Sequence, residues 1–273
     1  MVVQHNMQAA NTNRMLGMNV KAVSKSSEKL SSGYKVNRAA DDAAGLSISE
    51  KMRNQIRGIN QAVSNSEDGQ YLIQTAEGNM NEIHSILQRM GELATKAAND
   101  VNATEDRKSI QDELNQLSSE IDSIAKKAQF NGTYLLSGGM KSGKYLQVGA
   151  NKGEDMMISI QTMNAAKLSV NVTKLSVDTH TKAGSVMTRV TAAIKTVSAQ
   201  RSKLGAIQNR LDYTINNLQN YSENLTSAES NIRDTDMATE MVNYSKNNIL
   251  QQAAQSMLAQ ANQSNQSVLS LLQ

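Results

Sequence analysis

The chain has 273 residues but contains no cysteine, no proline and no tryptophan, and its one phenylalanine is Phe130. Without cysteine, disulfides, zinc–thiolate sites and cysteine nucleophiles are excluded. The absence of proline removes the strongest interruption to a helix. Aromatic residues make up only 3% of the chain, so the large side chains that fill most globular cores are scarce. These absences favour long, uninterrupted helices over a conventional globular domain.

Charge is also scarce, and it is missing from both ends of the chain. Between residues 1 and 20 the only charged side chain is Arg14, and residues 247–273 contain no Asp, Glu, Lys or Arg. The net charge is +3 without a basic cluster, so we expect no nucleic-acid partner. No apolar run is long enough to suggest a membrane span. The first residues lack the pattern of an ordinary secretory signal, so we expect any export to follow another route.

The uncharged C-terminal segment has the spacing of a helix. Fifteen of residues 247–273 are Asn, Gln or Ser, and the other twelve are aliphatic or Met. Positions that alternate steps of four and three are Leu250, Ala254, Met257, Ala261, Ser264, Val268 and Leu271. A water-exposed face normally carries charge, whereas this helix carries amides, which cost less to bury. The pattern predicts contact with something outside the chain.

Three heptad seams run through the rest of the sequence. One keeps the alternation from Val186 to Ile232, which predicts a helix roughly 70 Å long. A second comprises Ile73, Ala76, Met80, Ile83, Leu87, Met90, Ala94 and Ala97, preceded by Met52, Ile56, Ile59, Val63, Ser66 and Gln70. The change of register near Ile73 predicts a stammer. A third comprises Ile110, Leu114, Leu117, Ile121, Ile124 and Ala128, and we expect Asn102, with Glu105, to cap its helix.

Only the middle of the chain has a period of two. Turn sequences flank Thr133–Leu136, and Leu146, Val148, Met156, Ile158 and Ile160 alternate across a turn at 149–155, which predicts a hairpin. We expect Leu168, Val170 and Val172 to form a further extended piece. Gly33 and the Asp41–Asp42 pair predict a break at 31–42 before a helix from about Ala43. The fold class is therefore mainly α: an elongated long-helix hairpin or coiled-coil bundle with a small β-hairpin region at one tip.

The sequence offers no catalytic, cofactor or metal site. His5, His84 and His180 are isolated and no H-E-x-x-H occurs. Residues 138–144 nearly fit a phosphate-binding loop, but Tyr145 occupies the Ser/Thr position, so a glycine-rich turn is the favoured interpretation. Asp41–Asp42 has no third ligand, and helix capping is favoured over an acid pair or a metal site. We therefore expect no enzyme and no cofactor.

Four stretches closely resemble the bacterial flagellins. They are SSGYKVNRAADDAAGLSISEKMRNQIRG (31–58), IQTAEGNMNEIHSILQRMGELATKAAN (73–99), QFNGTYLLSGG (129–139), and most of residues 198–263, including NRLDYTINNL and ENLTSAESNIRDTDMATEMVNYSKNNILQQAAQSMLAQANQ. The resemblance implies terminal helices, 1–42 plus 233–273, that form an inner filament core as a discontinuous domain. It implies a helical rod over 43–232 with a β cap at about 129–177. The short centre implies that the outer variable domains of many flagellins are absent.

The resemblance also implies a function, partners and a location. It implies a structural subunit that self-assembles into the flagellar filament for motility, secreted through the type III channel and extracellular. Its partners would be other subunits, an export chaperone, and the cap and hook-junction proteins, with no membrane partner. The implied polymerisation residues are Leu250, Ala254, Met257, Ala261, Val268 and Leu271. We further expect residues 1–40 and 235–273 to be mobile in the monomer and to order on assembly.

One further motif implies recognition by a Toll-like innate immune receptor. The flagellin contact motif Q-R-V-R-E-L-A-V corresponds here to QRMGELAT, residues 88–95. The implied contact residues are Gln88, Arg89, Glu92, Leu93 and Glu113. Gly91 replaces an arginine of the motif and removes a hydrogen-bond donor. The alternative to a filament subunit is a flagellar junction-type or other non-enzymatic helical adaptor that shares the terminal helices; an enzyme inserted in a flagellin is a remote third possibility.

Overall fold

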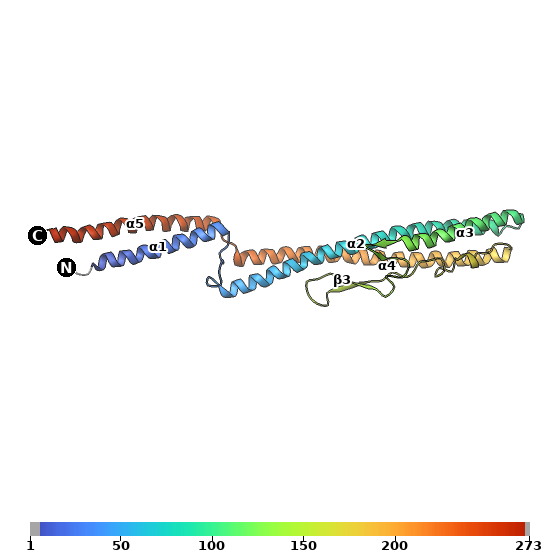
Figure 1. The fold of residues 1–273 in the computed structure, drawn as a ribbon, viewed down its shortest axis with the longest axis horizontal. Coiled ribbons are helices and arrows are strands. Elements are labelled where there is room, and N and C mark those ends of the chain that lie inside the picture. The colour runs from blue at the N-terminus through green and yellow to red at the C-terminus, as the bar shows by residue number, and fades with distance from the viewer. Residues whose placement is uncertain (1–5, 271–273) are drawn as a thin grey trace. The chain divides into compact units, whose positions relative to one another are not determined.

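The structure is a computed structural model that describes residues 6–270, with side chains described as far as residue 264. The helices are α1 (Met7–Ser32), α2 (Ala43–Ala97), α3 (Thr104–Lys127), α4 (His180–Arg233) and α5 (Met237–Ser270) (Figure 1). The short strands are β1 (Gln129–Phe130), β2 (Thr133–Tyr134), β3 (Lys144–Gln147) and β4 (Asp155–Ile158). The predicted mainly α class with a small β region is confirmed. The chain divides into two compact units, residues 57–222 and residues 1–56 with 223–273.

The seam of α2 is the centre of the core in the 57–222 unit. Its buried positions are Ile59, Ala62, Ser66, Gly69, Ile73, Ala76, Met80, Ile83, Leu87, Met90, Ala94 and Ala97. These positions alternate steps of three and four without a slip, so the stammer predicted near Ile73 is wrong. The error came from assigning Val63 and Gln70 to the seam in place of Ala62 and Gly69. Gly69 and Gly58 are crowded because segments after β2 lie against α2: a Cβ on Gly69 would meet Leu146, and one on Gly58 would meet Ala150.

Helices α3 and α4 complete this core. Buried positions of α3 are Ile110, Leu114, Ser118, Ile121 and Ala125, whereas the predicted Leu117 and Ile124 are half-buried. On α4 the predicted seam is buried from Val186 to Leu204 and at Leu211. Beyond Leu211 the predicted positions are half-buried or, at Tyr221, 48% exposed. Continuous heptad spacing therefore predicted the length of α4 but not where its burial stops.

The helix ends use local hydrogen bonds. Gly33 ends α1 in the left-handed conformation, with φ of 77°, and its N–H donates to the carbonyl of Lys29. Asp42 caps α2 as predicted, because its Oδ1 accepts from the Gly45 N–H at 2.9 Å. The predicted Asn102 cap of α3 is wrong. Ala103 is the N-cap residue, while the Asn102 amide donates instead to the Lys96 carbonyl at the end of α2.

The β segments follow the sequence signals closely, with one exception. Asn131 and Gly132 both have positive φ, 44° and 73°, as a two-residue hairpin turn between β1 and β2 requires. β3 and β4 pair antiparallel with Leu146 opposite Met156, which confirms the predicted hairpin. The extended piece predicted at residues 168–172 is wrong.

Local bonding explains the exception. The N–H groups of Leu168 and Val170 donate to the carbonyls of Asn164 and Ala165, and Ser169 has a positive φ of 59°. This compact turn, followed by a 3₁₀ turn at Val172–Lys174, buries Leu168 and Val170 without any strand. The alternating apolar residues Leu168 and Val170 are therefore buried by a turn. Because the backbone groups of this turn are hydrogen-bonded within it, no neighbouring strand is needed to pair them.

Two glycines of α2 give a matched test of this packing. A Cβ on Gly78 has no atom within 4 Å, whereas a Cβ on Gly58 lies 2.9 Å from the Cβ and 3.4 Å from the Cα of Ala150. We expect Gly78→Ala to raise the free energy of unfolding by about 1 kcal/mol through helix propensity. We expect Gly58→Ala to give no gain or a loss of about 1–2 kcal/mol, because the crowded backbone has to move. Urea unfolding followed by far-UV circular dichroism measures both; equal stabilisation by the two would contradict this packing.

Candidate assembly and recognition surfaces

The terminal helices α1 and α5 form an antiparallel pair, which brings both chain ends to the same end of the pair (Figure 1). The Asn6 side-chain amide donates to the Ala261 carbonyl at 3.0 Å. At the other end of the pair, the Lys29 ammonium lies 3.8 Å from a Glu240 carboxylate oxygen. These two contacts fix the direction and register of the helices.

The contact between α1 and α5 buries very little apolar surface. Ser26 is the buried residue of α1, and Ala261, 7% exposed, is the one buried residue among the described side chains of α5. The half-buried or buried positions of α5 are Glu240, Tyr244, Asn247, Asn248, Gln251, Ala254, Leu258 and Ala261. Most of these are polar. Since hydrophobic stabilisation scales with apolar area removed from water, this pair is weakly held by itself.

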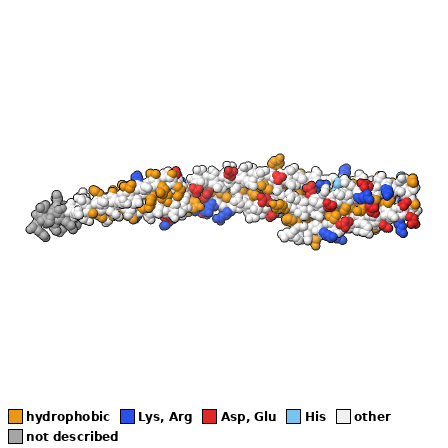
Figure 2. Space-filling view, turned by 90° about the horizontal axis from the view of Figure 1, so that it is seen from above, with side chains coloured by type: hydrophobic (Ala, Val, Ile, Leu, Met, Phe, Trp, Pro, Cys, Tyr) orange, Lys and Arg blue, Asp and Glu red, His pale blue; other side chains and the backbone are white. Residues whose placement is uncertain are grey.

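Large apolar side chains of the pair remain in water. They are Met7, Met15, Met18 and Val20 on α1, and Met237, Met241, Val242, Ile249, Leu250 and Met257 on α5. On α5, Val242, Ile249, Leu250 and Met257 lie on one side of the helix, where Leu250 and Met257 flank the half-buried face toward α1 and Val242 and Ile249 point away from it. Figure 2 shows apolar side chains gathered along these terminal helices, with few charges near the chain ends. We call this surface the terminal apolar surface.

The predicted polymerisation residues divide between two environments. Ala254 is half-buried and Ala261 is buried in the contact with α1. Leu250 and Met257 are 42% and 58% exposed and belong to the terminal apolar surface. The side chain of Val268 and the whole of Leu271 lie outside the described residues. One predicted seam therefore contains both residues that hold α1 and residues left open to a partner.

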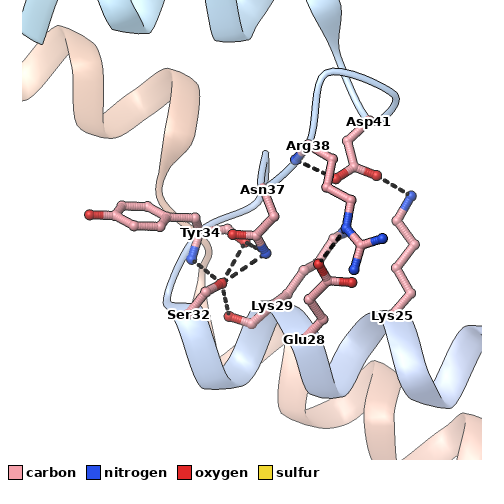
Figure 3. Close-up of polar contacts among 8 residues, drawn as sticks. All are labelled: Lys25, Glu28, Lys29, Ser32, Tyr34, Asn37, Arg38 and Asp41. Atoms are coloured by element: carbon pink, nitrogen blue, oxygen red, sulfur yellow. Dashed lines mark hydrogen bonds and ion pairs between the residues drawn. The ribbon is translucent and has the colours of Figure 1, made fainter.

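A network of ion pairs and hydrogen bonds holds the segment between α1 and α2 against α1 (Figure 3). The Asp41 carboxylate accepts from the Arg38 N–H and pairs with the Lys25 ammonium at 2.9 Å. These bonds, with that to Lys25 the strongest, hold the pKa of Asp41 below its ordinary value. The Arg38 guanidinium pairs with Glu28 at 3.0 Å. Each of these bonds therefore joins two residues that lie between positions 25 and 41.

Arg233 links this segment to the connection between α4 and α5. Its guanidinium lies 4.6 Å from the centre of the Tyr34 ring and pairs with Glu50 at 3.2 Å. Its carbonyl accepts from the Lys35 N–H at 2.7 Å. Asp236 then caps α5, and hydrogen bonds, first from the Thr239 N–H, lower the pKa of its carboxyl. Tyr34, Glu50 and Arg233 carry no local signal in the sequence, because their pairing joins positions nearly 200 residues apart.

A second surface lies where α2 passes α3. The Arg89 guanidinium donates to one Glu113 oxygen at 3.0 and 3.1 Å and to Glu92 at 3.1 Å. The bonds to Glu113, followed by those to Glu92, raise the pKa of Arg89. These three side chains line a groove of about 510 Å³ that also reaches Lys96 and Asp106. The structure thus brings Arg89, Glu92 and Glu113 together as one charged group.

The other two predicted receptor residues are placed differently. The exposed Gln88 amide lies 3.2 Å from His84 Nε2, on the same helix. Leu93 is only 3% exposed and belongs to the core, although its edge lines the groove. It therefore offers a partner little surface and mainly supports the position of its neighbours.

The described residues contain neither a metal-binding cluster nor a helix suited to cross a membrane. Across residues 6–270, no three His, Asp or Glu side chains lie together in a way that could hold a metal ion. In the same part of the chain, no helix combines the length and apolar character needed to cross a membrane. The features that remain define a mainly α-helical protein whose terminal helices carry exposed apolar side chains.

Comparison with known proteins identifies the family. The chain matches the bacterial flagellin N-terminal helical region over residues 3–141 and the bacterial flagellin C-terminal helical region over residues 187–272. It is 50% identical over 272 residues to a flagellin of Halalkalibacterium halodurans, and 47% identical over 305 residues to a flagellin of Bacillus subtilis. It is 44% identical over 286 residues to the flagellar filament 31.3 kDa core protein of Treponema maltophilum. Each match covers 100% of both chains.

The chain therefore belongs to the bacterial flagellins. It is a structural subunit of the flagellar filament, and the family is not enzymatic. Among solved structures, a Bacillus cereus flagellin matches with a TM-score of 0.51 and 30% identity, over 57% of this chain and 88% of that one. A putative flagellar hook-associated protein of Vibrio parahaemolyticus matches with a TM-score of 0.61 over 71% of this chain and 100% of that one, but at 16% identity it shows the fold alone.

The weak burial of α1 and α5 predicts their behaviour in the free monomer. Both are helices in the structure, yet their scarce buried contacts predict low local stability. We expect their amide hydrogens to exchange about 100-fold faster than those around Ile83 and Leu87 in the core of α2. Hydrogen exchange on monomer and on filaments measures this, and protection of the ends is expected to rise on assembly. Strong protection of both ends in the monomer would contradict it.

Proposed function

We propose that the terminal apolar surface is where subunits bind one another in the filament. Supporting this is one observation: among their described side chains, α1 and α5 leave ten large apolar residues exposed while burying one residue each. Exposed apolar side chains are unfavourable in water. Their removal from water on association offsets the entropy cost of ordering the helices. Residues 1–42 and 233–273 would then form the inner core of the filament. The rest of the chain would surround it.

The composition of α5 fits burial on more than one side. Beyond Lys246 it carries amides and hydroxyls but no charge. A neutral amide can be buried with a hydrogen-bond partner, whereas an unpaired charge costs several kcal/mol. A face of one subunit that meets a different face of the next gives an open helical polymer. The same contacts then add subunits without limit.

Substitutions at Met257 separate charge from shape. Glu and Gln have nearly the same size and helix propensity, so α5 itself should tolerate either. We expect Met257→Gln to elongate from seeds with a critical concentration within a few-fold of the parent. We expect Met257→Glu to raise the critical concentration about 100-fold or to abolish growth, because its carboxylate is desolvated without a partner.

Sedimentation and electron microscopy of seeded growth give the readout. Circular dichroism of each monomer serves as the control for folding. If the Met257→Glu protein elongates as well as the Met257→Gln protein, Met257 does not lie in a subunit contact, and the proposed surface is wrong there.

Export and the remaining partners are proposed from family membership. A flagellin subunit that reaches the outside of the cell through the type III channel travels unfolded, and weakly held terminal helices suit that passage. The proposed partners on this route are an export chaperone, the cap and the hook-junction proteins. A chain without cysteine also avoids cross-linking on the way.

The junction-type adaptor is the alternative function. Its support is the structural likeness to a putative hook-associated protein, which at 16% identity concerns the fold alone. Filament proteins of 44–50% identity match the full length of the chain, which favours the filament subunit. Long filaments from seeded monomer are expected from a subunit and not from an adaptor.

The second surface is proposed as the contact for a Toll-like innate immune receptor. The side chains of Arg89, Glu92 and Glu113 are between 44% and 69% exposed and form one charged group beside a groove. Gln88 lies next to them, and Leu93 supports them from the core. Buried arginine contacts often dominate a protein interface, so Arg89 is the expected centre.

We expect Arg89→Ala to weaken receptor binding about tenfold or more. The exposed pairs of Arg89 contribute little to folding, so the helices should remain intact. Arg210, an exposed arginine of α4, provides the matched control, and Arg210→Ala should bind as the parent does. Surface plasmon resonance with the receptor ectodomain measures both. Equal binding by the Arg89→Ala protein and the parent would remove this assignment.

A further inference from the structure

A polar groove lies largely in the part of the chain that neither flagellin region matches, residues 142–186. It has a volume of about 720 Å³, within the range of small-molecule sites. Its polar lining residues are Lys141, Ser159, Gln161, Thr162, Asn164 and Lys167. Five of these six lie outside the matched regions, so the groove is a feature of this chain's centre rather than of the shared helices.

Hydrogen bonds hold the walls of the groove in place. The N–H groups of Ile160 and Met163 donate to the carbonyls of Met140 and Leu136 at 3.2 and 2.9 Å. The buried amide of Gln200 donates to the Ser159 carbonyl at 3.2 Å. Because these bonds tie the loop to the core, the lining is preformed and little ordering is needed when a ligand binds.

The lining combines two cations with neutral hydrogen-bonding groups. Within the described chain, neither the Lys141 nor the Lys167 ammonium has an ion-pair partner, and no carboxylate lines the groove. The Asp122 carboxylate contacts the loop but accepts from the Ala165 N–H at 2.8 Å. Asn164 is also partly engaged, since its Oδ1 accepts from the Lys167 N–H at 2.9 Å. Two ammonium groups are therefore available to an anion.

We propose that this groove binds an acidic saccharide. The Lys141 and Lys167 ammoniums pair with its carboxylate or sulfate groups, and Ser159, Gln161 and Thr162 hydrogen-bond with its hydroxyls. A small inorganic anion would pair with the two ammonium groups but would leave the neutral side chains without a hydrogen-bond partner. The volume of the groove and the number of these neutral groups favour a polyhydroxylated ligand.

The test uses the full-length monomer with heparin oligosaccharide as the acidic probe and dextran of equal length as the neutral probe. We expect Lys141→Gln with Lys167→Gln to weaken heparin binding about tenfold, because two ion pairs are lost. The matched control, Lys108→Gln with Lys195→Gln, removes two exposed lysines elsewhere and should change binding less than twofold. Gln161→Ala should weaken it about threefold.

Isothermal titration calorimetry measures each affinity, and circular dichroism confirms that the variants fold. Three results would overturn the proposal. Equal losses in the two double variants would mean a diffuse basic surface, and dextran binding as tight as heparin binding would remove the acidic requirement. If inorganic sulfate displaces the oligosaccharide when both supply the same concentration of sulfate groups, the sugar hydroxyls do not contribute to binding and the site recognises only an anion.

Discussion

The unequal burial of apolar side chains determines how this chain behaves. In residues 57–222, the seams of α2, α3 and α4 are removed from water almost completely, as Ile83, Leu114 and Val197 show at 0% exposure. In the pair α1–α5 the largest apolar groups stay exposed. Hydrophobic burial is the main favourable contribution to folding, so the 57–222 unit is stabilised far more by its buried seams than the pair α1–α5 is by its own contact.

Polar contacts, rather than buried apolar side chains, hold the terminal helices and their connections in place. The terminal unit is organised by the Gly33 and Asp236 caps, by the Lys25–Asp41 and Arg38–Glu28 pairs, and by Arg233 against Tyr34. Such exposed contacts contribute modestly to stability but define direction and register. Terminal helices that are oriented yet weakly held suit a subunit that is added to a growing filament.

Heptad spacing predicted the helices and most of the buried seams, because periodicity is a local property of a helix. It failed at Ala62 and Gly69, which are buried in the seam in place of Val63 and Gln70; at Gly69 an added Cβ would meet Leu146 of the hairpin. It also placed Asn102 as a cap, although its amide closes the preceding helix. At Leu168 and Val170 alternation suggested a strand, yet a turn buries both. The error at Gly69 reflects a segment distant along the chain, whereas the errors at Asn102 and at Leu168 and Val170 reflect hydrogen bonds to residues four to six positions earlier.

The sequence by itself determined the helical class, the hairpin across residues 149–155, the uncharged ends and the family resemblance. Those conclusions rest on spacing, turn residues and composition, which need no knowledge of contacts. Only the tertiary structure decided that Leu93 is buried beside an exposed Arg89, that Ala261 faces α1 while Met257 faces water, and that Arg233 meets Tyr34. The physical reason is that exposure depends on which helix packs against each face, and that partner is distant along the chain.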